Sequence, residues 1–299
     1  MKAALLPDRG VVKVTGNEAR KLLNGLVTSD MGKVAPARPA FAALLTPQGK
    51  IIADFIIVDG AGMAGDDFHL DCPRALAPAL AECLKFYKLR AKVAIEDISG
   101  AVAVMAFWNG GAVAASATHY PDPRLSGLGL RCISPPDPAN AAATFGAELV
   151  DAAAYEAHRI ELGVPAGGLD FVYGDAFPHE ADMDQLAGVD FDKGCFVGQE
   201  VVSRMEHRGS ARTRVVPVAL GGAAPPPGAA VTADGKTVGV MGSSAGSRGL
   251  AALRLDRVAE ALASGLRLRA QETELRLVKP AWARFAFPGE ATPNAKAAG

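Results

Sequence analysis

The segment around Cys195 has the composition of a reactive site. Cys195 lies between Gly194 and Gly198, and Lys193 precedes it by two residues. A helix is expected to begin near Gly198. A thiolate close to a helix N-terminus and a cation is stabilised by the helix dipole and the positive charge, which makes it a better nucleophile or soft-metal ligand. Cys195 and Lys193 are therefore candidate catalytic residues. The alternative is a buried, inert cysteine in a turn.

Cys195 is not expected to belong to a resident metal site. The four cysteines are widely spaced and form no CxxC pair, whereas a chain that holds a cluster alone usually supplies about four cysteines close together. The histidines show no HxxxH or HExxH spacing, which argues against a zinc enzyme. We therefore expect no bound metal, and any contact between Cys195 and a cluster should be transient or shared with another protein.

A second candidate site lies on a helix expected to begin at Asp151 and end near Leu162. Tyr155 and Arg159 share one face of this helix because they are four residues apart, and Glu161 follows near its end. An aromatic ring, a guanidinium and a carboxylate suit a flat heterocycle such as a pterin, whose amino-pyrimidine edge offers paired donors to a carboxylate. The alternative is an ordinary amphipathic helix with an ion pair in solvent.

Five basic residues gather after the cysteine segment. They are Arg204, His207, Arg208, Arg212 and Arg214. Such a cluster suits a polyglutamate tail or a phosphate backbone, although a solvated helix end has the same composition. The net charge of the chain is only -1, from 31 Lys and Arg against 32 Asp and Glu. It therefore gives no long-range attraction to nucleic acid or to an anionic membrane.

Glycines at positions 60, 62 and 65 match the GxGxxG pattern of dinucleotide sites. The residues after them form a short β-like stretch before the next expected helix. These glycines are therefore expected to join two strands rather than to open a helix whose N-terminus binds a pyrophosphate.

The elements that must position these residues indicate an α+β protein. The strands expected before residue 110 are Gly10 to Thr15, Pro39 to Thr46, Lys50 to Val58, Lys92 to Ile98 and Val102 to Phe107. Helices are expected after a cap at Asn17, from a cap at Asp71 to about Tyr87, from Asp151 to about Leu162, and from near Gly198. The stretch Pro121 to Asn140 is rich in Pro, Gly and Asp and is expected to be mostly loop.

The chain after Arg212 changes character. It consists of short β-rich runs separated by turns such as Asp234-Gly235. The runs are Val215 to Leu220, Val231 to Met241, Leu250 to Leu255 and Leu266 to Leu277. This pattern predicts a small antiparallel barrel.

Length and composition bound the class of protein. With 299 residues, of which 49% are hydrophobic and 21% charged, the chain is long enough for about two or three domains with real cores. No apolar run approaches the roughly 20 residues that span a bilayer, and the cysteines suggest no disulfide framework. We therefore expect a cytoplasmic protein with no membrane partner.

The segment Lys193 to Glu200 resembles the KGC[FY]xGQE signature of the YgfZ family. That family comprises folate-binding proteins linked to iron–sulfur cluster assembly and repair, and to tRNA modification that depends on cluster enzymes. Four further segments match in family order, so the resemblance covers nearly the whole chain. They are Gly25 to Asp30, Leu45 to Lys50, Tyr87 to Arg90 and Arg159 to Pro165.

The resemblance implies the fold of the aminomethyltransferase of the glycine cleavage system. That fold has three domains around a central folate-binding channel, and the last domain is a small antiparallel β-barrel. The implied domains are a folate-binding α+β domain of residues 1–45 and 125–210, an inserted α+β domain of residues 46–124, a barrel of residues 211–288, and a disordered tail of residues 289–299. The resemblance also implies that Glu161 faces the pterin, that Tyr155 contacts folate and that Cys195 is the signature thiol.

The sequence departs from the pattern at two positions. Some members of the family have an aromatic residue just before the first strand, where this chain has Arg9. The transferases carry adjacent acids on the strand after the turn, whereas this chain has Ala53 and Asp54. Asp54 is still expected near the folate, but the acid pair for aminomethyl transfer is incomplete.

The predicted function is therefore a tetrahydrofolate-binding accessory protein for iron–sulfur cluster assembly or repair. Its expected partners are folate and the client or assembly proteins of the clusters. One alternative is a folate-dependent one-carbon (aminomethyl) transferase that uses Asp54. The other is a tRNA-binding protein that uses the basic residues from Arg204 to Arg214.

Overall fold

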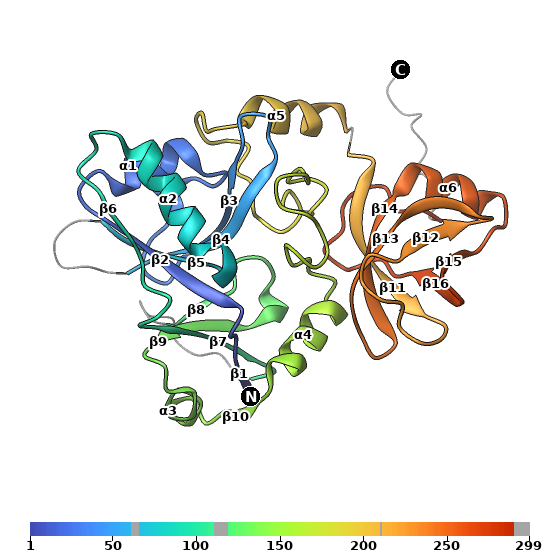
Figure 1. Ribbon diagram of the computed structural model, residues 1–299, viewed down its shortest axis with the longest axis horizontal. Helices are drawn as coiled ribbons and strands as arrows, with labels where there is room; N and C mark the ends of the chain where they lie inside the picture. Colours follow the sequence, from blue (N-terminus) through green and yellow to red (C-terminus); the bar gives the residue numbers. More distant parts are fainter. Residues whose placement is uncertain (61–65, 111–118, 210, 290–299) are drawn as a thin grey trace, which may run out of the picture.

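The first sheet carries the N-terminal half of the fold. The computed structural model describes residues 1–60, 66–110, 119–209 and 211–289. The strands of this sheet lie in the order β3-β4-β5-β2-β6 (Figure 1). They are β2 (Arg9–Thr15), β3 (Ala40–Leu45), β4 (Ile51–Asp59), β5 (Asp67–Pro73) and β6 (Ala94–Asp97). Side chains alternate between the two faces of a strand, so β4 contributes to two cores. Phe55 and Ile57 pack with the helices α1 (Ala19–Leu26) and α2 (Ala77–Lys88), whereas Ile56 and Val58 face the centre of the molecule.

The second sheet has the order β10-β1-β7-β9-β8. Its strands are β1 (Lys2–Leu5), β7 (Ala103–Trp108), β8 (His119–Pro121), β9 (Leu130–Ser134) and β10 (Glu148–Val150), and α3 (Pro138–Thr144) lies between β9 and β10 in the chain. Trp108 from this sheet, Ile56 from the first sheet and Tyr155 from α4 (Ala152–Glu161) belong to one buried cluster. The central core is therefore shared by both sheets and α4.

The C-terminal part is a closed six-stranded barrel. The strands β11-β14-β13-β12-β15-β16 pair in a ring and α6 (Leu255–Ala263) lies against it (Figure 1). They are β11 (Thr213–Leu220), β12 (Ala230–Ala233), β13 (Lys236–Ala245), β14 (Arg248–Arg254), β15 (Leu268–Ala270) and β16 (Thr273–Leu277). Asp234 and Gly235 both have positive φ in the β12–β13 turn, as a two-residue hairpin requires. The predicted fold class and barrel are confirmed.

A long irregular segment, residues 162–198, separates α4 from α5 (Gln199–Arg208) and lies between the sheets and the barrel (Figure 1). α5 begins after Gly198, whose φ is +81° and where a Cβ atom would lie 2.6 Å from the carbonyl oxygen of Thr46. Glycine is therefore required for this segment to pack against the turn between β3 and β4.

Three local predictions were wrong. Asp71 does not cap a helix but lies within β5, and α2 begins only at Ala77 after a 3₁₀ turn. The stretch from Pro121 to Asn140, expected to be mostly loop, contains β9 and the first three of the seven residues of α3. The first helix has Glu18, not Asn17, at its N-cap, and that cap has no side-chain hydrogen bond.

Two other expectations fall outside the described residues. Two of the three glycines of the GxGxxG pattern lie in residues 61–65, and the predicted disordered tail lies, apart from its first residue, in residues 290–299. Both ranges are outside the described residues.

The division into domains stays a prediction. Its boundary between residues 45 and 46 separates β3 from β4, which are paired neighbours, so we propose instead that residues 9–97 form one unit.

Candidate functional site

Cys195 lies on an exposed loop that the side chain of Lys193 fixes to the backbone near α1. Among the four cysteines it is the exposed one. The Nζ atom of Lys193 donates hydrogen bonds to the carbonyl oxygens of Asn24, Val27 and Ser29 at 2.8, 2.6 and 3.0 Å. These carbonyls lie at the C-terminal end of α1 and just beyond it. The loop therefore rests on the end of α1 and leaves the thiol open to solvent.

Lys193 is bound to the backbone rather than free to pair with the thiol. An ammonium group has three hydrogens, and the three carbonyl oxygens account for all of them. The residue is 7% exposed, and burial lowers the pKa of Lys193 to about 8, an effect opposed by the charges of Asp30 and Asp190. Lys193 is thus placed as a positioning residue for the Cys195 loop.

A pocket of about 600 Å³ lies between α4, β4 and the 162–198 segment. It brings together three of the predicted binding residues, Asp54, Tyr155 and Arg159. Tyr155 is 2% exposed and its ring packs edge-on against Trp108, with 5.4 Å between ring centroids. The pocket therefore has a rigid aromatic wall with ionisable groups beside it.

Arg159 is a buried connector between elements. Its guanidinium donates to the carbonyl oxygen of Val164 at 2.6 Å, to Oδ2 of Asp170 at 2.8 Å and to Oγ of Ser243 at 2.9 Å. It also pairs with Glu156 at 2.8 Å. The alternative of an ion pair in solvent therefore does not hold for Arg159, which joins α4 to β13 of the barrel.

Glu161 lies away from this pocket. Its side chain is 58% exposed, pairs with Arg248 of β14 at 3.2 Å, and lines a separate hollow of about 240 Å³. The carboxylate that α4 does present to the pocket is Glu156. The spacing along the helix could have predicted this difference. Glu156 is three residues before Arg159 and shares its face, whereas Glu161 is two residues after Arg159 and points about 200° around the helix axis from it.

Asp54 is held by a residue that the sequence did not single out. Asp54 is 6% exposed and accepts a short hydrogen bond from the hydroxyl of Tyr173. Burial, and then the charge of Asp54, raises the pKa of Tyr173 far above its ordinary value. A Cβ atom at Gly167 would lie 2.0 Å from the Tyr173 hydroxyl oxygen, so the missing side chain there lets Tyr173 reach Asp54.

Buried ion pairs form the floor of the pocket. Arg131 donates to Asp71 at 2.9 Å and to Asp122 at 3.0 Å, and Arg9 donates to Asp71 at 2.7 Å. Burial by itself would raise the pKa of Asp71, but Arg9 and Arg131 hold it below its ordinary range. Arg9, which stands where an aromatic residue was expected, is therefore part of this network.

The basic residues after the cysteine segment do not form one surface. Arg214 is 5% exposed and donates to Asp182 at 3.0 Å and to Asp184 at 2.7 Å. Arg204 on α5 pairs with Glu200. The predicted cluster is therefore divided between a buried network and a helix surface, which weakens its case as a nucleic-acid site.

A group of possible metal ligands lies beside this network. His179, Asp184 and Glu206 place ligand-type atoms within 4.8 Å of one another. Arg214 already donates to both carboxylate oxygens of Asp184, at 2.7 and 2.9 Å. A dication would have to share that carboxylate with a guanidinium, so we assign no metal to this group.

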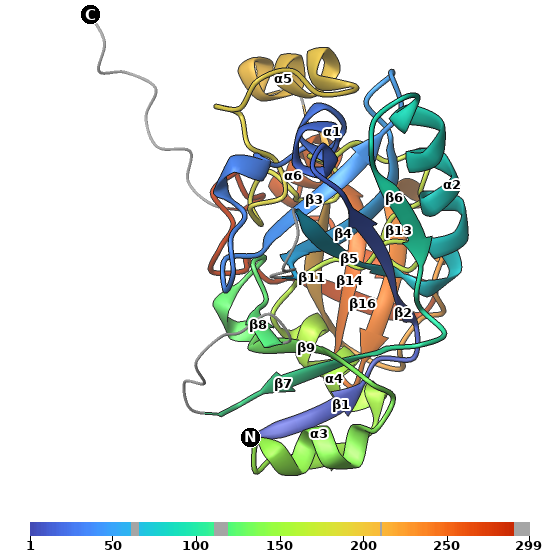
Figure 2. The ribbon, with the colours of Figure 1, turned by 90° about the vertical axis from the view of Figure 1, so that its left-hand side faces the viewer.

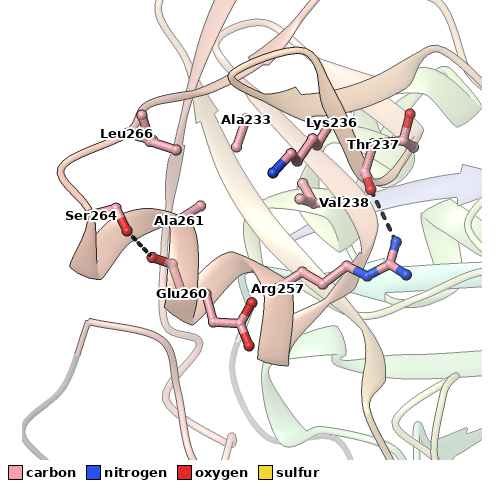
Figure 3. Close-up of a pocket in the computed structure, with 9 residues that line it drawn as sticks. All are labelled: Ala233, Lys236, Thr237, Val238, Arg257, Glu260, Ala261, Ser264 and Leu266. Atoms are coloured by element: carbon pink, nitrogen blue, oxygen red, sulfur yellow. Dashed lines mark hydrogen bonds between the residues drawn. The ribbon is translucent and has the colours of Figure 1, made fainter.

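A further hollow, with a volume of about 650 Å³, lies on the barrel between α6 and the β12–β13 hairpin, and Figure 3 shows the residues that line it. Its floor includes Val238 and Ala261, and Arg257 at its edge donates to the carbonyl oxygen of Thr237 at 3.3 Å. No residue predicted to belong to a site lines it.

None of the helices in the described residues combines the length and the hydrophobicity of a membrane-spanning segment.

Comparison with solved structures shows the fold. Aminomethyltransferase T of the glycine cleavage system from Bartonella henselae superposes with a TM-score of 0.73 over 96% of this chain and 87% of that chain, at 15% identity. The aminomethyltransferase-like fold is therefore confirmed. A family model described as the C-terminal beta-barrel domain of CAF17 matches residues 212–285.

Comparison with curated sequences shows the family. The mitochondrial iron–sulfur cluster assembly factor IBA57 homolog of Mycosarcoma maydis is 36% identical over 77% of this chain, which spans 60% of that relative's length. The mouse and human IBA57 proteins are 30% and 31% identical over 93% and 85% of this chain, and 84% and 77% of their own lengths are covered. These relatives are all named as mitochondrial, which contradicts the cytoplasmic location expected from the sequence. The extent and identity of these matches show that the chain belongs to the IBA57 family of iron–sulfur cluster assembly factors.

Proposed function

We propose that this chain is an accessory protein of iron–sulfur cluster assembly or repair in which Cys195 is the functional thiol, as its YgfZ-like signature implies. The observation that carries the proposal is the exposed thiol on a loop held by Lys193. The other cysteines are buried or partly buried, and burial raises the pKa of Cys72 to about 12. Since one thiolate cannot hold a cluster alone, Cys195 would share a cluster, as cargo, with another protein.

Complementation tests this proposal. In a strain that lacks its own copy of the gene, expression of this chain should restore the activity of an iron–sulfur enzyme, measured against a cluster-free enzyme in the same extract. Folded, expressed protein that restores no cluster-dependent activity would contradict the proposal.

We also propose that the 600 Å³ pocket binds a folate. Its volume lies in the range of sites for small molecules, the buried Tyr155 provides a wall for a ring, and the carboxylate of Glu156 suits the amino-pyrimidine edge of a pterin. Arg74 at the mouth suits a glutamate carboxylate. Tetrahydrofolate carries one-carbon units on its ring nitrogens, and these side chains would bind and orient it.

The two acids of α4 form a matched pair for testing the folate site. Replacing Glu156 by glutamine should weaken tetrahydrofolate binding by about tenfold or more, because a charge-assisted hydrogen bond contributes about 1.5–3 kcal/mol. Glu161→Gln should bind like the wild type, since Glu161 lies in another hollow. Isothermal titration calorimetry measures both. If only Glu161→Gln lost affinity for tetrahydrofolate, or if both variants kept the wild-type affinity, Glu156 would not belong to the site.

No feature of the described structure specifically supports either alternative function, aminomethyl transfer or tRNA binding. The residue beside Asp54 is Ala53, and Asp54 already accepts a hydrogen bond from Tyr173. Arg214, the last member of the basic cluster, is enclosed by carboxylates. We therefore do not propose aminomethyl transfer or tRNA binding.

A further inference from the structure

The C-terminal end of α2 exposes two large apolar side chains. Phe86 is 76% exposed and Leu89, just after the helix, is 83% exposed, the highest values among large apolar side chains in the described residues. Leu89 has a φ of +47°, a left-handed conformation that residues other than glycine seldom adopt. The sequence around them, Tyr87 to Arg90, is also one of the segments that the proposed pocket and thiol leave without a role.

Positive charge surrounds these apolar residues. The stretch from residue 85 to residue 92 contains Lys85, Lys88, Arg90 and Lys92 and no acidic residue. Lys88 donates to a backbone carbonyl at 2.8 Å and so keeps its charge unneutralised, whereas Lys85 is paired with Glu82. Within the described part of the chain, no hydrogen bond or ion pair involves the exposed side chain of Arg90. We call Lys85, Phe86, Lys88, Leu89 and Arg90 the α2-end patch.

A hollow on α1 lies next to the chain that follows this patch. It has a volume of about 310 Å³ and is lined by Leu22 and Leu26 of α1 and by Ala91. The backbone N–H of Lys92 donates to Glu18 at 2.7 Å, which ties this chain to the start of α1. The other end of α1 supports the Cys195 loop, and Figure 2 shows α1 and α5 at the same end of the molecule. One helix therefore links the apolar surface to the thiol.

We propose that the α2-end patch and this hollow dock an acidic segment, with apolar anchor residues, of the protein that receives or supplies the cluster. Exposed aromatic and aliphatic side chains in a polar rim are typical of protein interaction sites. Glu82 pairs with Lys85 and Glu18 lines the hollow, but Lys88 and Arg90 leave the patch with an excess of positive charge, which selects a negatively charged partner. Docking there holds the partner against the helix that carries the Cys195 loop. The partner's identity as a cluster protein rests on the proposed function, whereas the acidic chemistry of its segment rests on the patch alone.

Site-specific crosslinking in living cells tests the patch directly. The full-length chain carries a benzophenone amino acid at position 86, in a strain without its own copy of the gene, and the crosslinked peptide is identified by mass spectrometry. The expected product joins position 86 to an acidic segment of another protein. Its yield should fall about tenfold or more when Lys88 and Arg90 are both changed to glutamate, and should persist in Cys195→Ala.

Two positions on other elements serve as controls. The same crosslinker at Leu149 on β10 should not give this product, and Lys236→Glu on the barrel should leave its yield unchanged. Both residues are exposed. A product that survives the charge reversal, that joins two copies of this chain, or that contains only lipid would overturn the proposal, as would the absence of any product.

Complementation separates the failure of the patch from the failure of the proposed function. Phe86→Ser combined with Leu89→Ser should reduce the recovery of cluster-enzyme activity, while the thermal unfolding of the protein stays unchanged because both side chains lie in solvent. Full recovery with this double variant, together with no recovery in Cys195→Ala, removes the docking surface and keeps the thiol. Full recovery in Cys195→Ala removes the proposed role of the thiol, whatever the patch variants do.

Discussion

Replacing Cys195 by alanine should reduce the recovery of cluster-dependent enzyme activity to the level of a strain with no copy of the gene. The thiolate is the group that binds iron or attacks a disulfide, and a methyl group does neither. Because the side chain is exposed, the substitution removes little packing and thermal unfolding should match that of the wild type. Enzyme activity in the complemented strain, together with the amount of folded protein, gives the measurement.

Two further variants isolate the role of the thiol. Cys195→Ser keeps the size and polarity of the side chain but lacks a soft, easily ionised sulfur, so it should fail like alanine. Cys83→Ala removes a partly buried cysteine of α2, the pKa of which burial raises, and should restore activity fully. Full activity with Cys195→Ala would show that the loop acts through its shape rather than its sulfur.

Several elements were predictable because their signals are local. Asp151 caps α4 by accepting a hydrogen bond from the backbone of Ala154 at 2.9 Å, as its type and position suggest. Gly198 marks the start of α5, and the turn at Asp234 and Gly235 marks a hairpin of the barrel. Each of these features depends on residues within a few positions of one another.

The misplaced residues depend on partners far away in the sequence. Asp71 lies two residues before Pro73, a spacing compatible with a helix start, but it pairs with Arg9 and Arg131, which are 62 and 60 residues away. Asp54 meets Tyr173 across 119 residues. Tertiary contacts of this kind override a local preference and leave no periodic trace in one sequence. The partner of Asp54, Tyr173, therefore became visible only in the structure, whereas the spacing of Tyr155 and Arg159 already placed them on one face of a helix.

The ion-pair network under the pocket joins the two sheets. Arg131 lies on β9 of the second sheet and Asp71 on β5 of the first, and Arg131 also bonds to Asp122. All three side chains are almost completely buried. Burial alone would raise the pKa of both acids, but Arg124 and Arg131 lower the pKa of Asp122, as Arg9 and Arg131 lower that of Asp71. Both carboxylates are therefore ionised in the folded protein, and the arginines stabilise this ionised form.

Replacing Arg131 by methionine should lower the free energy of unfolding by about 3–5 kcal/mol, because it leaves two buried carboxylates short of positive charge. Urea unfolding measures this loss. Arg204→Met on the surface of α5 should cause no measurable change, since Arg204 is 52% exposed. Equal losses in the two variants would show that the network is not a source of stability.

The same variant should also change the response to acid. In the wild type, the contribution of Asp71 and Asp122 is present above the pKa of an unfolded aspartate, about 3.9, and is lost as the pH falls through their lower folded values. Replacing Arg131 removes one of the charges that lower the pKa of each acid, although Arg9 and Arg124 remain, so both folded pKa values rise and this contribution is smaller and is lost at a higher pH. Urea midpoints measured between about pH 3 and pH 7 should therefore begin to fall at a higher pH in Arg131→Met than in the wild type. Parallel pH curves for the two proteins would mean that Arg131 does not control the ionisation of these acids.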